Sequence, residues 1–417
     1  MKIYMRRVIV IGGGPAGMMA AIKAAENGAA VTLLEKMNRI GKKMLITGKG
    51  RCNITNAADI PEIIKNIPGN GVFLNSTLRA FDNEAVIQFF NAHGVPTKLE
   101  RGGRIFPESD RAADAVDAML SAMHELKVTV ETNSRVSVIL QEEQQIRGVR
   151  LSNGKVLTAD AVILAVGGAS YPGTGSTGDG YAMAEALGHT ITPLYPALVP
   201  LETEESWIKE AQGLSLRNVR VTLLIEGKKA VEEFGEMLFA HFGVTGPVIL
   251  SLSRPASAAL QAGKFVELSI NLKSALTPEQ LQARIQRDFA KYINKAAKNA
   301  LHDLLPGKLI APVLDLAYIK PDQAVHQITR EERLRLGDVL QHLGLTVLRT
   351  RPVSEAIVTA GGVSIKEIVP KTMESKRIHG LYFAGEVMDI DGFTGGYNLQ
   401  AAFSTGAAAG RWSAITE

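Results

Sequence analysis

The chain has 417 residues, with 46 Lys or Arg against 42 Asp or Glu and a formal net charge of +4. This length predicts one large domain or two to three smaller ones, and the composition is that of a globular protein. Because the small positive charge is scattered along the sequence, we expect no nucleic-acid partner.

A single cysteine, Cys52, excludes a disulfide within the chain and a thiolate metal cluster, and it is typical of a reducing compartment. No signal peptide is visible, and the apolar runs fall short of the ~20 residues that a membrane span requires. We therefore expect a soluble, cytoplasmic protein with no metal site and no membrane partner. The sequence leaves the oligomeric state open.

A strand–turn–helix–strand pattern over residues 7–35 is the first motif of the chain. A buried parallel strand is predicted to end at a glycine-rich turn, in which Gly12, Gly14 and Gly17 have the spacing G-x-G-x-x-G. Such glycines allow a tight turn, the approach of a diphosphate and close packing of the helix on the strand. The motif therefore predicts a bound dinucleotide.

The ends of this motif carry further contacts. Pro15 and Ala16 open the helix, where free N–H groups and the positive end of the helix dipole favour a diphosphate. Glu35 ends the second strand about 20 residues after the glycines and can accept both hydroxyls of an adenosine ribose. An acid at this position disfavours the 2′-phosphate of NADP. Its neighbour Lys36 completes the predicted adenosine site.

Residues 41–56 form a glycine-rich, basic stretch, GKKMLITGKGRCNITN. We expect it to run along the cofactor from its pyrophosphate, with Lys42 and Lys43 offsetting phosphate charge. Gly48 and Gly50 would let the backbone approach a ring system. An ordinary surface loop with scattered lysines is the alternative interpretation.

Two side chains outside these motifs are candidate reacting groups. Arg104, in GGRIFP, could bind a carboxylate or polarise a carbonyl, because its charge persists at all working pH values. The alternative for Arg104 is a salt bridge to Glu108 or Asp110. His241, in AHFGVTGP, could donate a proton or orient a substrate, or it could be a turn residue with satisfied hydrogen bonds.

Two further strands are predicted beside the dinucleotide. In the strand at 133–139, Val136 is placed to offer a backbone amide to the adenine. The apolar strand at 160–168 ends in two glycines, and its Ala165 and Gly167 are expected cofactor contacts. A second glycine pattern, at 173–178, lacks an adjacent strand and a following acid. It therefore does not predict a second dinucleotide fold.

The predicted fold class is α/β, a Rossmann-like dinucleotide-binding domain interrupted by a β-rich plus helical insert. We expect the first part of this domain at 1–195, a β-rich insert at 196–275, a helical insert at 276–349 and the second part at 350–417. Thr277 is the predicted N-cap of the first insert helix. Because sites tend to form between domains, a small-molecule substrate is expected between the insert and the cofactor.

Residues 379–412 decide between the possible dinucleotides. A short strand ends at Gly385 and Glu386, and a helix of small residues begins near Gly396. A helix N-terminus stabilises an anion without a counter-ion, which suits the charge on N1 of a reduced flavin, whereas NAD has no use for it. The segment therefore predicts FAD. Its expected contacts are Gly385, Glu386, Gly396, Tyr397, Asn398 and Leu399. Tyr397 is also a possible proton donor.

With these motifs in order, the chain resembles the BaiN-like bacterial flavoproteins, which belong to the glutathione-reductase and fumarate-reductase type of FAD proteins. The runs GRCN-x-TN and GGYN carry the likeness, which covers nearly the whole chain. It implies a tightly but non-covalently bound FAD in a glutathione-reductase-type domain, with Asp179 at the cofactor as in the fumarate-reductase group. Arg51, Cys52 and Asn53 would flank the flavin, although a lone Cys is more often simply packed.

The resemblance also implies an activity. A family member reduces a C=C bond in oxo-bile acids, so we expect an NAD(P)H-dependent reductase of an activated C=C in a small, possibly steroid-like hydrophobic molecule. With one dinucleotide fold, the nicotinamide would bind transiently. The alternatives are an FAD-dependent oxidase of an amine or hydroxy-compound and a non-catalytic flavin-binding sensor. Flavin-dependent RNA modification is disfavoured by the lack of a concentrated basic surface.

Overall fold

The computed structural model of the chain describes residues 5–415. The chain divides into two compact units. Unit 1 spans Met1–Tyr195 and Val353–Glu417, and unit 2 spans Pro196–Pro352. Within residues 5–415, every helix is too short or too polar to span a lipid bilayer.

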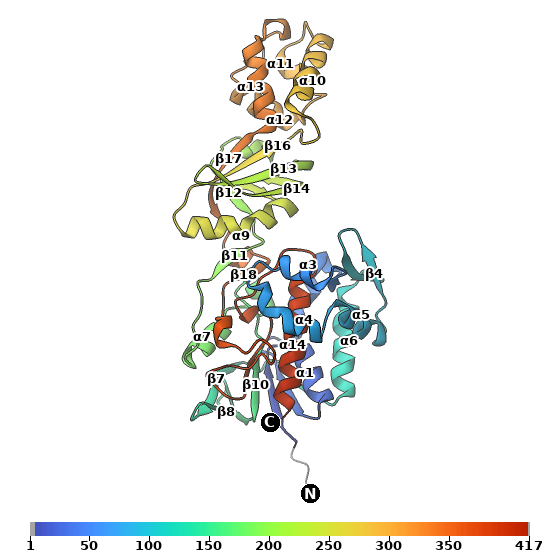
Figure 1. Ribbon diagram of the computed structural model, residues 1–417, viewed down its shortest axis with the longest axis vertical. Helices are drawn as coiled ribbons and strands as arrows, with labels where there is room; N and C mark the ends of the chain where they lie inside the picture. The colour runs from blue at the N-terminus through green and yellow to red at the C-terminus, as the bar shows by residue number, and fades with distance from the viewer. Residues whose placement is uncertain (1–4, 416–417) are drawn as a thin grey trace. The chain divides into compact units, whose positions relative to one another are not determined.

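Unit 1 is built on a five-stranded parallel sheet in the order β19-β10-β1-β2-β6 (Figure 1). Strands β1, β10 and β19 are almost wholly apolar and buried, as is typical of a parallel sheet that is covered on both faces. The strands are β1 (Arg7–Ile11), β2 (Ala30–Leu34), β6 (Thr129–Glu131), β10 (Ala161–Leu164) and β19 (Leu381–Phe383).

Helices α1 (Pro15–Glu26) and α14 (Tyr397–Ala414) come from opposite ends of the chain and pack against each other. A Cβ on Gly406 would collide with the carbonyl oxygen of Ala16, so the two backbones approach each other too closely for a larger residue there. This close approach explains the run of Ala and Gly in α14. It places the start of α1 against the middle of α14, because Ala16 meets Gly406 and Ala20 meets Gly410.

The rest of unit 1 consists of short helices and two small antiparallel sheets, β3-β5-β4 and β7-β8-β9. The helices are α2 (Lys42–Ile46), α3 (Ile60–Lys65), α4 (Asn75–Ala80), α5 (Asn83–Ala92), α6 (Ala112–Glu125) and α7 (Asp179–Ala186). The strands are β3 (Thr55–Asn56), β4 (Thr97–Glu100), β5 (Arg104–Pro107), β7 (Val136–Glu142), β8 (Gln145–Leu151), β9 (Val156–Thr158) and β18 (Val358–Ala360). Strand β11 (Tyr195–Ala197) crosses the boundary between the units.

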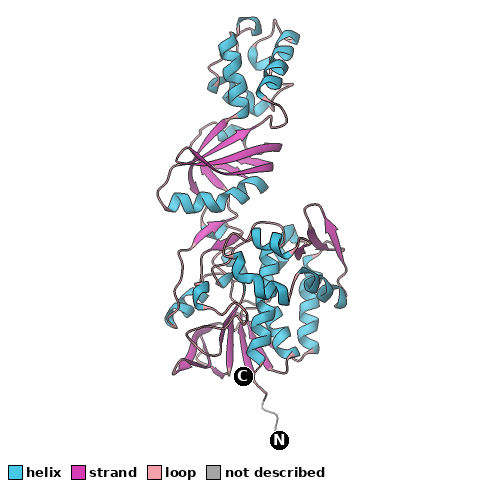
Figure 2. Ribbon diagram, viewed as in Figure 1, coloured by secondary structure: helices cyan, strands magenta, loops and turns pink. Residues whose placement is uncertain are grey.

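Unit 2 contains a closed antiparallel barrel in the strand order β12-β15-β14-β13-β16-β17, drawn in magenta in Figure 2. In β16, buried residues alternate with half-buried ones, so one face of the strand fills the barrel interior. The strands are β12 (Leu201–Thr203), β13 (Ser215–Ile225), β14 (Lys228–Ala240), β15 (Gly243–Thr245), β16 (Val266–Asn271) and β17 (Leu343–Thr350).

The helices of unit 2 depart from the expected ranges in two places. They are α8 (Ile208–Ala211), α9 (Pro247–Gln261), α10 (Pro278–Lys291), α11 (Ala297–Ala300), α12 (Gly307–Leu316) and α13 (Arg330–Gln341). Thr277 caps α10, since its hydroxyl accepts the N–H of Gln280. The end of the expected helical range is instead strand β17, whose buried residues alternate along LGLTV and pair with β12 and β16. Helix α9 lies inside the range expected to be β-rich.

Candidate cofactor site

The turn between β1 and α1 has the geometry that the glycine spacing predicts. Gly12 has a φ of +106°, and a Cβ there would lie 2.5 Å from the carbonyl oxygen of Ala165. A Cβ on Gly17 would collide with the carbonyl oxygen of Gly12. At Gly14, the N-cap of α1, nothing lies within 4 Å of where a Cβ would stand. No side chain among the described residues caps this helix, so its first N–H groups fit a diphosphate.

Glu35 lies just after β2 and faces this turn. Its Oε2 accepts a hydrogen bond of 2.8 Å from the N–H of Gly13, and its Oε1 accepts one of 2.7 Å from the N–H of Met37. These bonds fix the carboxylate but leave lone pairs for ribose hydroxyls, because a carboxylate offers about four acceptor sites. The second glycine pattern borders this site, since Gly175 has a φ of +106° and faces Met37 and Glu35.

Lys36 and Asp179, two expected cofactor contacts, bind each other. The ammonium of Lys36 lies 3.1 Å from Oδ2 of Asp179, which also pairs with Arg135 at 3.1 Å. Burial alone would raise the pKa of Asp179, but the Thr177 hydroxyl and the Lys36 ammonium hold this pKa below its usual value. Asp179 is therefore an anion balanced by two cations. Val136 is buried at the start of β7, directly after Arg135.

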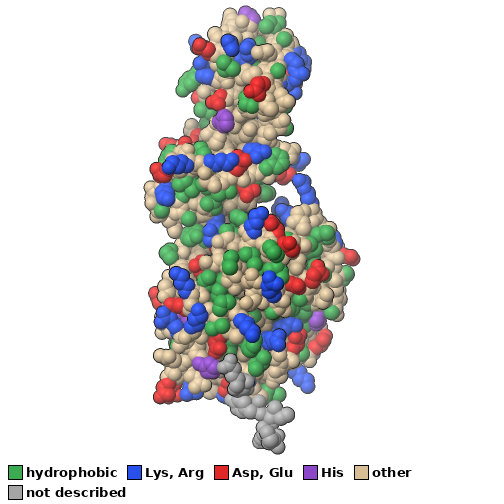
Figure 3. Space-filling view, viewed as in Figure 1, with side chains coloured by type: hydrophobic (Ala, Val, Ile, Leu, Met, Phe, Trp, Pro, Cys, Tyr) green, Lys and Arg blue, Asp and Glu red, His purple; other side chains and the backbone are tan. Residues whose placement is uncertain are grey.

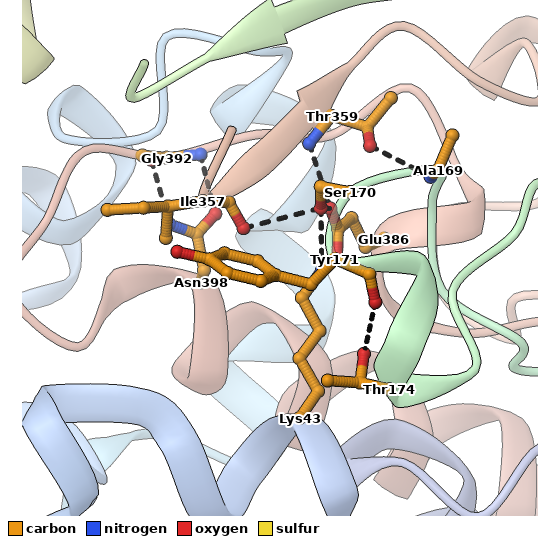
Figure 4. Close-up of polar contacts among 10 residues, drawn as sticks. All are labelled: Lys43, Ala169, Ser170, Tyr171, Thr174, Ile357, Thr359, Glu386, Gly392 and Asn398. Atoms are coloured by element: carbon orange, nitrogen blue, oxygen red, sulfur yellow. Dashed lines mark hydrogen bonds and ion pairs between the residues drawn. The ribbon is translucent and has the colours of Figure 1, made fainter. Parts of the chain in front are cut away.

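Lys43, at the start of α2, and Glu386, which follows β19, form an ion pair (Figure 4). The ammonium of Lys43 donates to Oε2 of Glu386 at 2.6 Å and to the hydroxyl of Ser170 at 2.8 Å. Oε1 of Glu386 accepts the N–H of Thr359 at 2.8 Å and the Ser170 hydroxyl at 3.0 Å. The charge of Lys43, expected to offset phosphate, is thus balanced by a carboxylate. Lys42 makes no ion pair with any described residue and keeps its charge available.

The glycine-rich turn after α2 supplies a buried polar atom that lacks a partner. In the turn η1 (Thr47–Gly50), Gly48 and Gly50 have φ values of +57° and +85°. Oδ1 of Asn53, which follows shortly after, is buried and accepts no hydrogen bond from residues 5–415. A buried acceptor without a donor is costly. A bound flavin, whose ring carries an N–H, is a group that could remove this cost, so the residues present fit FAD.

Arg51, expected to flank the flavin, is held in place by side chains of the protein. Its guanidinium pairs with Glu100 and, at 2.6 Å, with Asp110, and it lies 4.2 Å from the centre of the Phe106 ring. Asp110 also pairs with Lys98 at 2.7 Å. Asp110 is therefore occupied by two other cations and is not the partner that was considered for Arg104.

The start of α14 is joined to β3 and β5 by close backbone contacts. Gly396, its N-cap, has a φ of +98°, and a Cβ there would collide with the backbone of Thr55. The amide of Asn56 donates to the carbonyl oxygens of Gly102 at 3.0 Å and Gly395 at 2.9 Å. The runs GRCN-x-TN and GGYN, which are far apart in the sequence, are thus parts of one assembly.

Arg104 and Tyr397 come together at this assembly. The guanidinium of Arg104 makes no ion pair or hydrogen bond with any residue that the structure describes. Burial raises the pKa of Tyr397, Glu62 raises it further, and the nearby charge of Arg104 opposes both. The third candidate, His241, is exposed in unit 2, where its ring contacts that of Phe242. Only Arg104 and Tyr397 are therefore brought together.

Asn398 and Leu399, also expected cofactor contacts, have structural partners. Oδ1 of Asn398 accepts the N–H of Gly392 at 2.8 Å, and its amide nitrogen donates to the carbonyl oxygens of Gly392 and Phe393. Leu399 packs half-buried against the core of unit 1. These two side chains therefore shape the loop and the helix start.

Three polar residues of the site were not predicted from the sequence. They are Asn56, Ser170 and Thr359. Asn56 could have been identified from the sequence, because it is the last residue of the run GRCN-x-TN, which carries the family likeness. Ser170 follows Gly167, whose φ is +73°, but nothing in a single sequence indicates that Thr359, on strand β18, accepts a hydrogen bond from the neighbouring N–H of Ala169.

Relatives of known activity align with nearly the whole chain. The 3-dehydro-bile acid delta(4,6)-reductase of Clostridium scindens is 34% identical over 424 residues, which cover 98% of this chain and 99% of that protein. The ribosomal RNA dihydrouridine synthase of Escherichia coli is 32% identical and covers 95% of each chain. Among solved structures, the open conformation of a flavocytochrome c3 fumarate reductase matches with a TM-score of 0.53 at 18% identity. That match covers 98% of this chain and 78% of the other, and it shows the fold.

These comparisons confirm the expected α/β fold class and the expected enzyme class, an FAD-dependent oxidoreductase. The family described as HI0933-like protein Rossmann domain matches residues 6–412. The chain belongs to this HI0933-like, or BaiN-like, family of FAD-dependent oxidoreductases, as its motifs predicted.

Proposed function

We propose that this enzyme reduces a C=C bond conjugated to a carbonyl, with a reduced nicotinamide as transient electron donor. The names of the two relatives describe one type of chemistry. A Δ4 bond beside a 3-oxo group is an enone, and dihydrouridine forms when the C5=C6 bond conjugated to the C4 carbonyl of uracil is saturated. In both cases hydride adds β to the carbonyl, negative charge develops on the carbonyl oxygen, and a proton is added at the α carbon.

The observation that carries this proposal is the exposed guanidinium of Arg104, which has no ion pair among the described residues and lies close enough to Tyr397 for its charge to lower the pKa of the phenol. A permanent cation without a protein partner can stabilise the negative charge that develops on a carbonyl oxygen. Tyr397 has a raised pKa and is therefore protonated at neutral pH, as a donor to the α carbon must be. FAD, when bound and reduced by the nicotinamide, would supply the hydride. The described residues hold one dinucleotide fold, which is why the nicotinamide is proposed to bind transiently.

The first candidate substrate is a small 3-oxo, Δ4-unsaturated molecule of steroid type. It corresponds to the relative with 34% identity, and reduction of an enone of this kind is assisted by a hydrogen-bond donor or cation at its oxygen and by a proton donor. Arg104 and Tyr397 match these two requirements. His241 lies in unit 2, and its role as a proton donor stays a prediction.

A second candidate substrate, uracil in ribosomal RNA, is favoured by cations around the same segments. Lys42, Lys49, Arg101 and Arg104 make no ion pair with other described residues, and η1 lies against β5, since Gly48 faces Phe106. Unpaired cations suit a phosphate-bearing partner. Basic and acidic side chains are otherwise interspersed on the face shown in Figure 3, so RNA binding would depend on this local group.

Turnover of both substrates by the purified holoenzyme tests the proposal. The enzyme is incubated with NADPH or NADH and a 3-oxo-Δ4,6 bile acid, and the product is identified by its gain of two hydrogens. In parallel, ribosomal RNA from cells with and without the gene is digested and its dihydrouridine is measured by mass spectrometry. Reduction of either substrate supports the reaction class and identifies the substrate. Flavin that is bleached only by an amine or hydroxy-compound and reoxidised by oxygen would establish an oxidase instead.

Arg104→Ala should lower kcat by roughly 10²–10³-fold on the substrate that is turned over, as the loss of one oxyanion donor does. The visible spectrum of the bound flavin should not change. Arg147→Ala is the matched control, because Arg147 is half-exposed on the β7–β8 hairpin and pairs with Glu142. A wild-type kcat in Arg104→Ala would show that Arg104 does not stabilise the developing negative charge.

A further inference from the structure

Tyr171 has a backbone conformation that aromatic residues rarely adopt. Its φ and ψ of 52° and 61° lie in the left-handed region, where a bulky residue is strained. Residues that follow Tyr171 hold this conformation. Its carbonyl oxygen accepts hydrogen bonds from the N–H of Thr174 at 2.9 Å and from the Thr174 hydroxyl at 2.7 Å. The next residue, Pro172, opens the turn η3 (Pro172–Thr174).

The residue before Tyr171 is fixed as firmly. Ser170 is fully buried, and its hydroxyl lies 2.8 Å from the ammonium of Lys43 and 3.0 Å from Oε1 of Glu386. The N–H of Ala169 donates to the Thr359 hydroxyl at 2.9 Å. The backbone on both sides of Tyr171 is thus over-determined, which is the condition under which strain persists and often marks a functional residue.

The side chain of Tyr171 has no structural role that would explain this strain. The residue is 37% exposed, and its hydroxyl makes no hydrogen bond with other residues in the described part of the chain. Figure 4 shows the ring extending from the Tyr171 backbone toward Gly392, in the loop before α14, and Asn398, the second residue of α14. The ring is therefore directed into the region of the Lys43–Glu386 pair and the start of α14.

We propose that Tyr171 presents its ring to the isoalloxazine of FAD and is a contact residue of the cofactor. Its segment leads directly from the end of β10, where Ala165 packs against the glycine turn that receives the diphosphate. It ends between Glu386 and the loop before α14, the two elements that carry the flavin-side motif. A flat, partly exposed aromatic ring stacks favourably on a flat heteroaromatic ring. The proposal rests on FAD binding and not on the identity of the substrate.

The test compares Tyr171→Asn and Tyr171→Phe in the full chain. Asn tolerates the left-handed conformation, so Tyr171→Asn removes the ring without adding backbone strain. We expect the apoprotein of this variant to melt at or above the wild-type temperature. We expect its Kd for FAD, from titration of the apoprotein, to rise at least tenfold and the fluorescence of its bound flavin to increase. Tyr171→Phe keeps the ring and should bind FAD within twofold of wild type.

Tyr318→Asn is the matched control. Tyr318 has a φ of +57° and is 78% exposed, but it lies in unit 2, where its ring contacts Arg335. This variant should show the same thermal response with unchanged FAD affinity and flavin fluorescence. If Tyr171→Asn does not fold, Tyr171→Leu, which keeps apolar bulk without an aromatic ring, should show the same loss of FAD affinity.

Wild-type FAD affinity and fluorescence in a folded Tyr171→Asn or Tyr171→Leu would overturn the proposal. So would an equal loss of affinity in Tyr171→Phe, because the hydroxyl rather than the ring would then make the contact.

Discussion

Helices α1 and α14 both begin at a glycine N-cap, but the two helix starts are built differently. At α1, the surroundings of Gly14 are open, and the turn is shaped by backbone contacts at Gly12 and Gly17. At α14, the backbone of Thr55 covers Gly396, and the amide of Asn56 holds the residue before it. The first start is therefore specified by glycine spacing and the second by contacts with a distant segment, the backbone of Thr55 and the side chain of Asn56. Substitutions at the two starts should differ accordingly.

The largest effect is expected at the first helix start, from Gly17→Ala. Its Cβ would collide with the carbonyl oxygen of Gly12, and neither backbone can move away inside a packed sheet and helix. Overpacking of this kind should cost about 3 kcal/mol or more of the free energy of unfolding. Urea unfolding of the apoprotein measures it.

Gly14→Ala is the control from the same turn. Gly14 has a φ of −80° and nothing within 4 Å of a Cβ, so the apoprotein should unfold within about 0.5 kcal/mol of wild type. The added methyl group would stand where the diphosphate is expected, and FAD affinity should fall at least tenfold. Wild-type FAD affinity in Gly14→Ala would contradict the assignment of this turn to the diphosphate.

An intermediate loss of the free energy of unfolding is expected at the Lys43–Glu386 ion pair, from Lys43→Met. It leaves the carboxylate of Glu386, which is 19% exposed, without its cation, at a cost of about 1–3 kcal/mol. Glu386→Gln should cost a similar amount, and the double variant should recover part of both losses. Denaturant unfolding of the four proteins gives the coupling energy, expected at about 1–2 kcal/mol.

The exposed pair of Lys155 and Glu131 provides the matched cycle. Its side chains are 52% and 30% exposed, so its coupling should stay below about 0.5 kcal/mol. Equal coupling energies in the two pairs would show that the Lys43–Glu386 pair is not protected from solvent. The conclusion that the α14 end of the site depends on such side-chain pairs would then be weaker.

The same contrast decides how far the sequence could predict the site. Gly12, Gly14, Gly17 and Glu35 act through backbone geometry at fixed spacing, which can be read along a chain. The partners of Lys43 cannot be read from the sequence in this way, because the predicted phosphate contact and the observed ion pair use the same ammonium group. Which one forms depends on Glu386, a residue that lies 343 positions away. Arg51 is a similar case, since its partners Glu100 and Asp110 come from another hairpin.

In the fold, local signals also succeeded where they were strong. Four of the five parallel strands, β1, β2, β10 and β19, and the cap at Thr277 follow from apolar runs and capping chemistry, whereas the short edge strand β6 was not predicted. Strand β17 was assigned to the helical range because it directly follows helix α13 and has no turn residue of its own before Leu343. Closure of the barrel by β17 requires pairing with β12 and β16, and such long-range pairing leaves no mark in the local sequence.

The smallest effect is expected at Cys52, which is buried between η1 and β3. Burial raises the pKa of its thiol to about 12, although the side chain of Thr47 opposes this shift. The folded state therefore keeps the proton in a pH range where the unfolded chain, with an ordinary value of 9.0, loses it. The contribution of Cys52 to stability is thus fully present below pH 9.0 and is lost as the pH rises toward 12.

Cys52→Ala should remove this alkaline dependence and otherwise lower the free energy of unfolding by only about 1 kcal/mol. The thiol of the wild-type protein should not react with a thiol reagent at pH 8 until the chain is unfolded. The reduction rate of the bound flavin should be the same in Cys52→Ala and wild type. Rapid labelling of the folded protein, or loss of flavin reduction in the variant, would mean that this thiol is accessible at the flavin. The Cys52 thiol would then be a reactive group next to the flavin, which its burial argues against.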